Sequence, residues 1–440
     1  MTGKRILFLF VIFLSNRGVN AQSWSTFGTG MNDDVATFAV YNGDLYAGGL
    51  FVTADGDTVN FVTKWNGITW NTLGTGLDFA VWVLAVHNAE LYAGGAFYYA
   101  GNTPLNFISK WNGTAWDSLG SGMDDWVLAL ASYNGELYAG GYFTYAGGNQ
   151  ANYIARWNGT SWNSVGVGMD FFVWSFVVYN GDLYAGGEFT SAGGSPAYSI
   201  ARWNGTSWSP VGFGLNDAVF AMTVYNGELC VGGRFTTAGG SPAVGISKWN
   251  GTTWSSIGGG MGGTYPYVYA LTVYNGELYA GGVFTTAGGN PANYVAKWNG
   301  VAWSALGIGM NDAVTSLNVY NGDLCAGGWF TAAGSITANH VAKWNSPLGV
   351  QENSMSDEIN LFPNPATTEV TINFGKAARC TVQLCNTLGE VLEHRTLTHN
   401  PSPSGEGSAS IDVSKFVPGI YFITVTDEEG NKMVRKVVKM

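Results

Sequence analysis

Residues 127–168, VLALASYNGELYAGGYFTYAGGNQANYIARWNGTSWNSVGVG, are one copy of a unit that recurs along most of the chain. The phrase Trp-Asn-Gly-x-x-Trp within this unit returns every 46 residues, except for one step of 49. It starts at Trp65, Trp111, Trp157, Trp203, Trp249 and Trp298, and a seventh start at Trp344 is cut short by Ser346-Pro347. A period near 46 with paired turn signals is typical of a four-stranded unit repeated around a ring.

Each unit is predicted to form four antiparallel strands. In the copy quoted above, the runs rich in strand-forming residues are 127–133, 136–143, 153–157 and 160–165. Asn-Gly separates the first two runs and the last two, and this dipeptide favours two-residue hairpin turns. Such a turn at 158–159 predicts that Trp157 faces Thr160, with Trp157 and Trp162 as diagonal neighbours on one face of the sheet. We expect these tryptophan pairs to serve packing, with ligand stacking as the alternative.

Charge follows the same period. Residues 22–346 hold eight cations, and seven of them directly precede the first Trp of the Trp-Asn-Gly phrase or its cut-short copy. An acid lies 20 residues upstream of each, in the pairs Asp44/Lys64, Glu90/Lys110, Glu136/Arg156, Asp182/Arg202, Glu228/Lys248, Glu277/Lys297 and Asp323/Lys343. The acid begins the second strand and the base ends the third, so antiparallel pairing brings them to the same end. The sequence predicts seven ion pairs that mark the register, each contributing about 0–1 kcal/mol if exposed.

The ends of the repeat region predict a closed ring. Residues 23–30 match the fourth run of the unit and precede the first copy of the first run, whereas the fourth run is missing after Trp344. We expect the N-terminal segment to complete the last sheet beside residues 340–344, which leaves no open edge strand. The fold class is therefore all-β: a seven-bladed β-propeller over residues 22–346, closed by an N-terminal strand. An open solenoid is the alternative.

The phrases repeated in each unit also resemble those of known protein families. The Gly-Gly pair with its following aromatic residue resembles the repeats of kelch-type propellers. The fuller phrase, Ala-Gly-Gly-x-Phe-Thr, then Ala-Lys/Arg-Trp-Asn-Gly-x-x-Trp, then Leu-Gly-x-Gly-Met, is similar to repeats of fungal bud-site cortical marker proteins and of many exported Bacteroidetes proteins. The resemblance implies a propeller and no particular activity, because that fold hosts enzymes, lectins and scaffolds alike.

Residues 358–440 follow a different pattern. Alternating apolar runs near 370–374, 381–384, 411–413 and 420–425, separated by turn residues, predict a small immunoglobulin-like β-sandwich. Four blocks resemble the type A sorting domain of the type IX secretion system: Leu361-Phe362-Pro363-Asn364-Pro365, Leu388-Gly389-Glu390-Val391, Pro418-Gly419-Ile420-Tyr421-Phe422 and Arg435-Lys436-Val437-Val438-Lys439.

This resemblance implies export across an outer membrane and the type IX secretion machinery as a partner. The motif residues it assigns to that role are Pro363, Asn364, Pro365, Gly389, Gly419, Tyr421 and Lys436. It further implies removal of the module, followed by release or by attachment to surface lipopolysaccharide. An immunoglobulin-like adhesion module is the alternative.

The beginning of the chain is predicted to be a signal peptide, residues 1–21. Lys4 and Arg5 precede an unbroken apolar run over 6–14, and Val19-Asn20-Ala21 fits the small-x-small cleavage rule. Residues 347–357 are expected to be a linker. Nine apolar residues are too few for a transmembrane segment. The formal net charge of −11 becomes −14 without Lys4, Arg5 and Arg17, which argues against nucleic acid and anionic membranes as partners.

Catalytic and metal-binding motifs are sparse. His-x-His, Cys-x-x-Cys, His-Glu-x-x-His and Gly-rich phosphate loops do not occur, so we expect no metal and no cofactor. The best candidate surface is the set of loops that lead from one unit into the next, because they should ring the mouth of the central channel. They combine carboxylates with aromatic rings, as carbohydrate-binding sites do. The candidate ligand-binding residues are Asp34, Asp78, Phe79, Asp125, Trp126, Asp170, Phe171, Asp217, Tyr265, Tyr267 and Asp312.

Together these observations predict an exported propeller, at the cell surface or released, that acts as a non-catalytic binding module for a glycan or protein ligand. The first alternative is a glycan-active hydrolase or lyase, which needs two carboxylates in different environments. The second is a purely structural repeat protein, in which the loop aromatics are buried.

Overall fold

The computed structural model describes residues 23–345, 359–363, 365–374, 379–386, 391–398, 408–427 and 432–439. The chain divides into two compact units, residues 1–346 and residues 347–440. Strands, turns and bends make up the described part, in which no helix is long and apolar enough to cross a membrane. The expected signal peptide (1–21) and linker (347–357) lie outside the described residues.

The first unit is built from repeated four-stranded antiparallel sheets, which is the architecture of a β-propeller. We call the four strand positions A to D. Strand A is β2 (Val35–Tyr41), β8 (Val81–His87), β14 (Val127–Tyr133), β20 (Val173–Tyr179), β26 (Val219–Tyr225), β33 (Tyr267–Tyr274) and β39 (Val314–Tyr320). Strand B is β3 (Asp44–Gly49), β9 (Glu90–Gly95), β15 (Glu136–Gly141), β21 (Asp182–Gly187), β27 (Glu228–Gly233), β34 (Glu277–Val283) and β40 (Asp323–Gly328).

The outer half of each sheet is shorter. Strand C is β6 (Val62–Trp65), β12 (Ile108–Trp111), β18 (Ile154–Trp157), β24 (Ile200–Trp203), β30 (Ile246–Trp249), β37 (Val295–Trp298) and β43 (Val341–Trp344). Strand D is β7 (Trp70–Thr72), β13 (Trp116–Ser118), β19 (Trp162–Ser164), β25 (Trp208–Pro210), β31 (Trp254–Ser256), β38 (Trp303–Ala305) and β1 (Trp24–Thr26).

Short hairpins lie in the loops between strands B and C. They are β4 (Thr53–Ala54) with β5 (Asp57–Thr58), β10 (Tyr99–Ala100) with β11 (Thr103–Pro104), β16 (Tyr145–Ala146) with β17 (Asn149–Gln150), β22 (Ser191–Ala192) with β23 (Ser195–Pro196), β28 (Thr237–Ala238) with β29 (Ser241–Pro242), β35 (Thr286–Ala287) with β36 (Asn290–Pro291), and β41 (Ala332–Ala333) with β42 (Ile336–Thr337). An additional strand, β32 (Met261–Gly262), pairs with β35.

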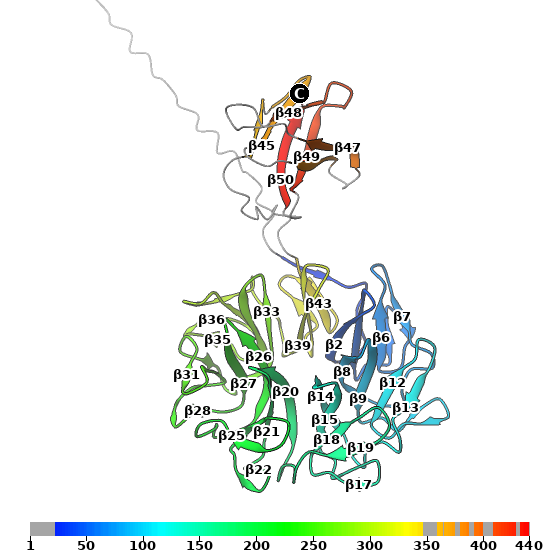
Figure 1. Ribbon diagram of the computed structural model, residues 1–440, viewed down its shortest axis with the longest axis vertical. Helices are drawn as coiled ribbons and strands as arrows, with labels where there is room; N and C mark the ends of the chain where they lie inside the picture. The colour runs from blue at the N-terminus through cyan, green and yellow to red at the C-terminus, as the bar shows by residue number, and fades with distance from the viewer. Residues whose placement is uncertain are drawn as a thin grey trace, which may run out of the picture. The chain divides into compact units, whose positions relative to one another are not determined.

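Neighbouring sheets pack face to face, and their A strands contact one another in chain order until β39 contacts β2 (Figure 1). The first glycine of the Gly-Gly pair in strand B permits this close approach. A Cβ at Gly94 would lie 2.5 Å from Val127 Cγ1 of the next sheet, and one at Gly327 would lie 2.7 Å from Val35 Cγ1. The second contact joins the last sheet to the first, so the same packing recurs where the chain returns to its start.

The N-terminal segment completes the last sheet in the predicted place. In the register of β1 and β43, Trp24 is opposite Trp344 and Thr26 is opposite Ala342. Side chains of β39 also bond to the backbone of β2. Thr315 Oγ1 donates to the carbonyl of Val35 at 2.8 Å, which ties the last A strand to the first.

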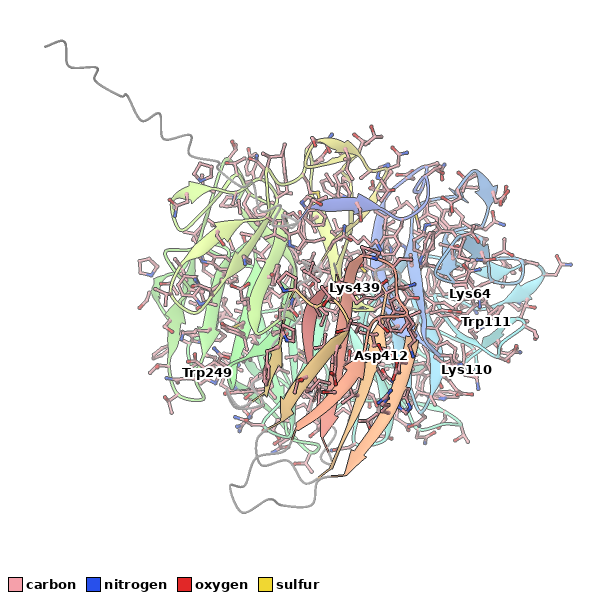
Figure 2. The ribbon with its side chains drawn as sticks, turned by 90° about the horizontal axis from the view of Figure 1, so that it is seen from above. Lys64, Lys110, Trp111, Trp249, Asp412 and Lys439 are labelled. Atoms are coloured by element: carbon pink, nitrogen blue, oxygen red, sulfur yellow. The ribbon has the colours of Figure 1, made fainter. Side chains whose placement is uncertain are left out.

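All seven predicted ion pairs are present, with N···O distances from 2.6 to 3.5 Å. Figure 2 shows two of the bases, Lys64 and Lys110, which belong to neighbouring sheets. The partly exposed side chains limit each pair to about 0–1 kcal/mol. The regular recurrence therefore indicates a role in register rather than a large contribution to stability.

The predicted register of the C–D hairpin is wrong by two residues. Trp157 lies opposite Trp162, with ring centroids 5.3 Å apart, so the loop has four residues instead of two. Asn158 Oδ1 accepts the backbone N–H groups of Thr160 and Ser161 at 3.0 and 2.9 Å, which stabilises the longer turn. The A–B hairpin does have the two-residue turn, because both Asn134 (φ 50°) and its following glycine adopt positive φ.

The second unit contains two antiparallel sheets. One has the order β44 (Ile359–Phe362), β45 (Glu369–Phe374), β48 (Ser408–Asp412), and the other has the order β47 (Val391–Thr398), β46 (Arg379–Cys385), β49 (Gly419–Asp427), β50 (Lys432–Lys439). Both sheets contribute to one core, which includes Ile372 and Ile423. Among the motif residues, Tyr421 is buried and donates to the carbonyl of Val417 at 2.8 Å. Asn364 and Gly389 lie outside the described residues.

Candidate functional site

A cavity of about 530 Å³ lies where the A strands begin and the B strands end. We call it the central cavity, since every A strand lines it with one residue: Ala36, Trp82, Leu128, Trp174, Phe220, Tyr269 and Thr315. Each of these residues occupies a break in the A–B register. A β-bulge leaves one residue unpaired and re-aims its side chain. The repeated bulge therefore supplies the cavity lining, and the residue type at that position decides its chemistry.

Aromatic rings form a continuous series along much of the cavity. We call it the aromatic wall: Trp82, Trp126, Tyr142, Trp174, Phe220, Tyr269 and Trp329. Successive centroids lie 5.3–6.2 Å apart, and the closest approach is between Phe220 and Tyr269. The first sheet departs from this pattern, since its lining residues are Asp34, Ala36 and Leu50.

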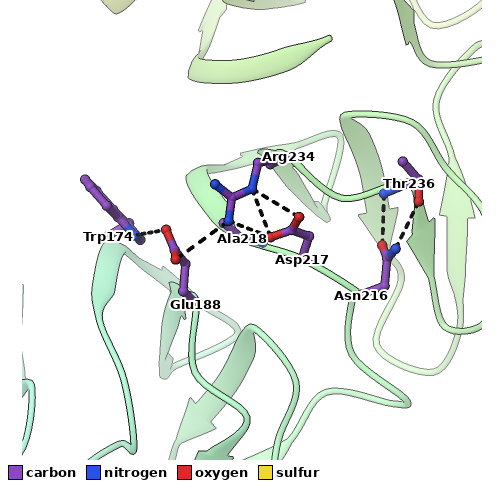
Figure 3. Close-up of polar contacts among 7 residues, drawn as sticks. All are labelled: Trp174, Glu188, Asn216, Asp217, Ala218, Arg234 and Thr236. Carbon is purple, nitrogen blue, oxygen red and sulfur yellow. Dashed lines mark hydrogen bonds and ion pairs between the residues drawn. The ribbon is translucent and has the colours of Figure 1, made fainter. Parts of the chain in front are cut away.

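A charged group lies beside the wall between the fourth and fifth sheets (Figure 3). Arg234 donates from Nε and Nη2 to Asp217 at 2.9–3.0 Å, and its Nη2 lies 3.7 Å from Glu188 Oε2. The other oxygen of Glu188 accepts the indole N–H of Trp174 at 3.1 Å. Burial raises the pKa of Asp217, but the bonds from Arg234 and a backbone N–H outweigh it and leave the pKa below its usual value. Asp217 thus stays ionised and holds the guanidinium in place.

A second carboxylate lines the cavity from the first sheet. Asp34 Oδ1 lies 3.4 Å from Nδ1 of His340, which is cationic only when protonated. The pKa of Asp34 is raised, first by burial and then by the nearby carboxylate of Asp33, with a further contribution from Asp312. The electrostatic attraction of His340 opposes this shift. The cavity thus holds a carboxyl group whose ionisation is less favourable than that of a carboxyl group in water.

The structure places the predicted site residues in three groups. Asp34 and Trp126 line the central cavity, and Asp217 contacts it through Arg234. Asp78 and Asp170 line neither this cavity nor its aromatic wall. Their Oδ1 atoms each accept two backbone N–H groups from the short B–C hairpin at 2.8 and 2.9 Å.

The remaining candidates are peripheral. The carboxylates of Asp125 and Asp312 each accept the N–H of the next residue at 2.7 Å, within their own loops. Phe171 is 40% exposed and stacks on Phe172, which itself stacks on Tyr142 of the aromatic wall. The other three lie outside the cavity lining as well: Phe79, Tyr265 and Tyr267.

Sequence reasoning missed most of the lining, including Trp82, Trp174, Glu188, Phe220, Arg234, Tyr269 and Trp329. Two signals could have found them. Arg234 is the one cation of the repeat region that stands outside the seven ion pairs. Glu188, Arg234 and Trp329 each follow the Gly-Gly pair of strand B, a position at which the repeats differ strongly in chemistry. Variation between otherwise uniform copies, rather than the shared phrase, marks this site.

Within the described residues, no group of three or more His, Cys, Asp or Glu side chains is arranged to hold a metal ion. The polar groups of the lining residues are carboxylates, a guanidinium, indole N–H groups and the hydroxyls of Tyr269 and Thr315. They can accept hydrogen bonds from hydroxyl groups or donate hydrogen bonds to them, and the rings offer apolar faces for packing.

Two family models match parts of the chain. Residues 360–440 match the secretion system C-terminal sorting domain. Residues 134–159 match a β-propeller domain of unknown function, DUF5122. The sorting domain shows that the protein is secreted through the type IX secretion system to the cell surface or the extracellular space. No curated protein matches the chain.

Several solved structures are similar to it. The computationally designed protein Ika8 has 14% identity and a TM-score of 0.43, over 93% of this chain and 98% of that chain. The designed protein Ika4 has 14% identity and a TM-score of 0.27, over 40% and 92%. An α-L-arabinofuranosidase from Clostridium thermocellum has 14% identity and a TM-score of 0.28, over 53% and 95%.

Proposed function

We propose that the exported propeller is a non-catalytic carbohydrate-binding module whose ligand enters the central cavity. The observation that carries the proposal is the aromatic wall, with the Glu188–Arg234 ion pair beside it. Sugar rings present C–H groups to aromatic faces and hydroxyls to charged acceptors and donors. A volume of about 530 Å³ is within the usual range for small-ligand sites.

The charges of the cavity favour a neutral or basic sugar over an acidic one. Asp34 and Glu188 contribute −2 when ionised and Arg234 contributes +1, which leaves a formal charge of −1 among the lining residues. Asp217, bonded to Arg234, makes it −2. An acidic ligand would be repelled, and Arg234 is already neutralised by its carboxylate partners.

We infer a closed seven-bladed propeller related to kelch-like or bud-site-marker-like repeats, a signal peptide over residues 1–21, and an immunoglobulin-like sandwich as the sorting module. The return of the A strands to β2 and the pairing of β1 with β43 support the closure. The shared core of the two C-terminal sheets supports the sandwich.

A glycan array probed with the full-length chain tests the binding proposal. The informative variant is Trp329→Ala, because Ala96 occupies the equivalent position after Gly-Gly in the second sheet and the substitution fits the repeat. Tyr99→Ala is the matched control, since Tyr99 is 47% exposed against 44% for Trp329 and lies outside the cavity lining. We expect signals on neutral glycans that Trp329→Ala abolishes and Tyr99→Ala retains. An empty array, or signals unaffected by Trp329→Ala, would contradict the proposal.

A second candidate function, a glycan-active hydrolase or lyase, is favoured by Asp34. Its raised pKa is the property that a general acid needs, and Glu188 supplies another carboxylate in the same cavity. Incubation with neutral oligosaccharides and chromatography of the products decides between the two functions. Product formation that is lost in both Asp34→Asn and Glu188→Gln would establish the enzyme, whereas unaltered oligosaccharides agree with a binding module.

A further inference from the structure

A second cavity, of about 800 Å³, opens beside the central cavity between the fourth and fifth sheets. We call it the side groove. It shares Glu188 and Arg234 with the central cavity, so the two spaces meet at this ion pair. Its lining also includes Tyr198 and Phe213, which come from the B–C loop of the fourth sheet and the loop leading to the fifth.

The side groove lies where a repeated contact is replaced. At five junctions between sheets, an asparagine of the B–C loop donates from Nδ2 to a carbonyl in the Gly-x-Gly loop that leaves the same sheet, at 2.9–3.1 Å. These residues are Asn60, Asn106, Asn152, Asn293 and Asn339. Tyr198 takes the asparagine's place in the fourth sheet. Its backbone carbonyl accepts the N–H of Leu215, as the carbonyl of the asparagine accepts the equivalent N–H in the five sheets that have it. The amide donor is therefore lost at this junction.

The partner loop is altered at the same junction. The middle residue of Gly-x-Gly is Thr29, Thr75, Ser121, Val167, Gly259 or Ile308 in the other sheets and Phe213 here. Phe213 is 86% exposed and Tyr198 is 53% exposed. Two large rings in water gain little from packing, so their joint presence in the lining of the side groove indicates a surface for stacking.

We propose that the ligand is a linear oligosaccharide whose terminal unit occupies the central cavity and whose following units run through the side groove. This rests on the proposed function. The Glu188–Arg234 pair stands at the boundary and bonds the hydroxyls of the unit that passes it. Beyond it, Tyr198 and Phe213 stack against the later units. The site thus recognises a chain end together with its adjoining units.

Calorimetric titration of the full-length chain with neutral xylo-, cello- and arabino-oligosaccharides of one to six units tests this inference. The variant is Tyr198→Asn with Phe213→Thr, which installs residue types that other sheets carry at the same positions. The control is Ile308→Thr, at the equivalent loop position of the sixth sheet, where Ile308 is 66% exposed. Thermal unfolding of all three proteins verifies that they are folded.

We expect the wild-type affinity for one of these series to rise about tenfold or more with chain length, as about 1.4 kcal/mol of added stacking would give. The double variant should keep the affinity for the shortest ligands and lose the rise, and Ile308→Thr should keep both. A wild-type affinity independent of length, or a rise unchanged in the double variant, would overturn the inference. If the affinity did not depend on ligand length but Trp329→Ala still weakened it, binding in the central cavity would be supported and the side groove would be excluded from the site. Absence of binding in all three series would refute both.

Discussion

Trp24 and Trp344 lie opposite each other in the sheet that joins the two ends of the repeat region, with their ring centroids 5.1 Å apart. Trp24 is 6% exposed, and its indole N–H donates to the carbonyl of Leu306 at 3.2 Å. One side chain therefore connects the first described strand to the last two sheets. The chain does not connect β1 directly to the other strands of its sheet, so this contact helps to hold β1 against β43.

We expect Trp24→Ala to lower the free energy of unfolding by about 3–5 kcal/mol, because a large buried ring leaves a cavity at the closure. Urea denaturation followed by tryptophan fluorescence measures the change. Val301→Ala is the control, since Val301 is 84% exposed in a C–D turn. A Trp24→Ala protein as stable as this control would mean that the N-terminal strand does not hold the ring closed.

The stability of the protein should depend on the ionisation of Asp34. Its folded-state pKa is raised, first by burial, so ionisation destabilises the fold at pH values above the unfolded-state pKa of about 3.9. We expect Asp34→Asn to raise the midpoint of thermal unfolding at pH 7 and to leave it unchanged near pH 3, where both proteins are neutral at this position. Asp57→Asn, an exposed site on β5, is the control. Equal midpoints for Asp34→Asn and wild type at pH 7 would contradict the expectation.

Asp170→Asn should leave glycan binding and stability nearly unchanged. Asp170 accepts two backbone N–H groups of the short B–C hairpin, and Asn216 makes the equivalent bonds in the fifth sheet at 2.9 and 2.8 Å. An amide oxygen can therefore perform the same task. The glycan affinity and the unfolding midpoint of the variant are measured beside those of wild type. A large loss of affinity with an unchanged midpoint would show that Asp170 belongs to the binding site.

Acidic oligosaccharides should bind more weakly than neutral ones of the same length. The excess of carboxylates around Arg234 repels them, and this repulsion is screened as ionic strength rises because the Debye length falls to about 10 Å at 0.1 M salt. Titrations with oligogalacturonates at low and high salt measure the effect. Glu188→Gln should reduce the difference in affinity between acidic and neutral ligands. Tighter binding of the acidic series than of the neutral series by wild type would refute the charge argument.

Much of the framework could be predicted from sequence because it depends on local patterns that repeat. Lys110 pairs with Glu90 as the spacing of 20 residues requires, and each of the other six copies repeats that contact. The C–D turn was mispredicted because Asn-Gly is compatible with two loop lengths. The side-chain oxygen of Asn158 bonds the backbone in a way that the dipeptide alone does not specify.

The candidate site was harder to predict because its residues share no phrase. Trp174 and Phe220 come from equivalent bulges, which the alternation of strand residues does not reveal. The acids of the loops were visible in the sequence, but Asp78 bonds to backbone rather than to the cavity. Only the pairing of the strands shows that the residue after Gly-Gly, such as Arg234, meets the bulge residues of several sheets in one place.

A crystal structure of the protein with the best neutral oligosaccharide from the array would show where the ligand binds. We expect a sugar ring against the aromatic wall, between Trp82 and Trp329, with hydroxyls bonded at Glu188 and Arg234. Sugar density confined to the outer strands or to the C-terminal unit, with the central cavity holding only water, would contradict this expectation.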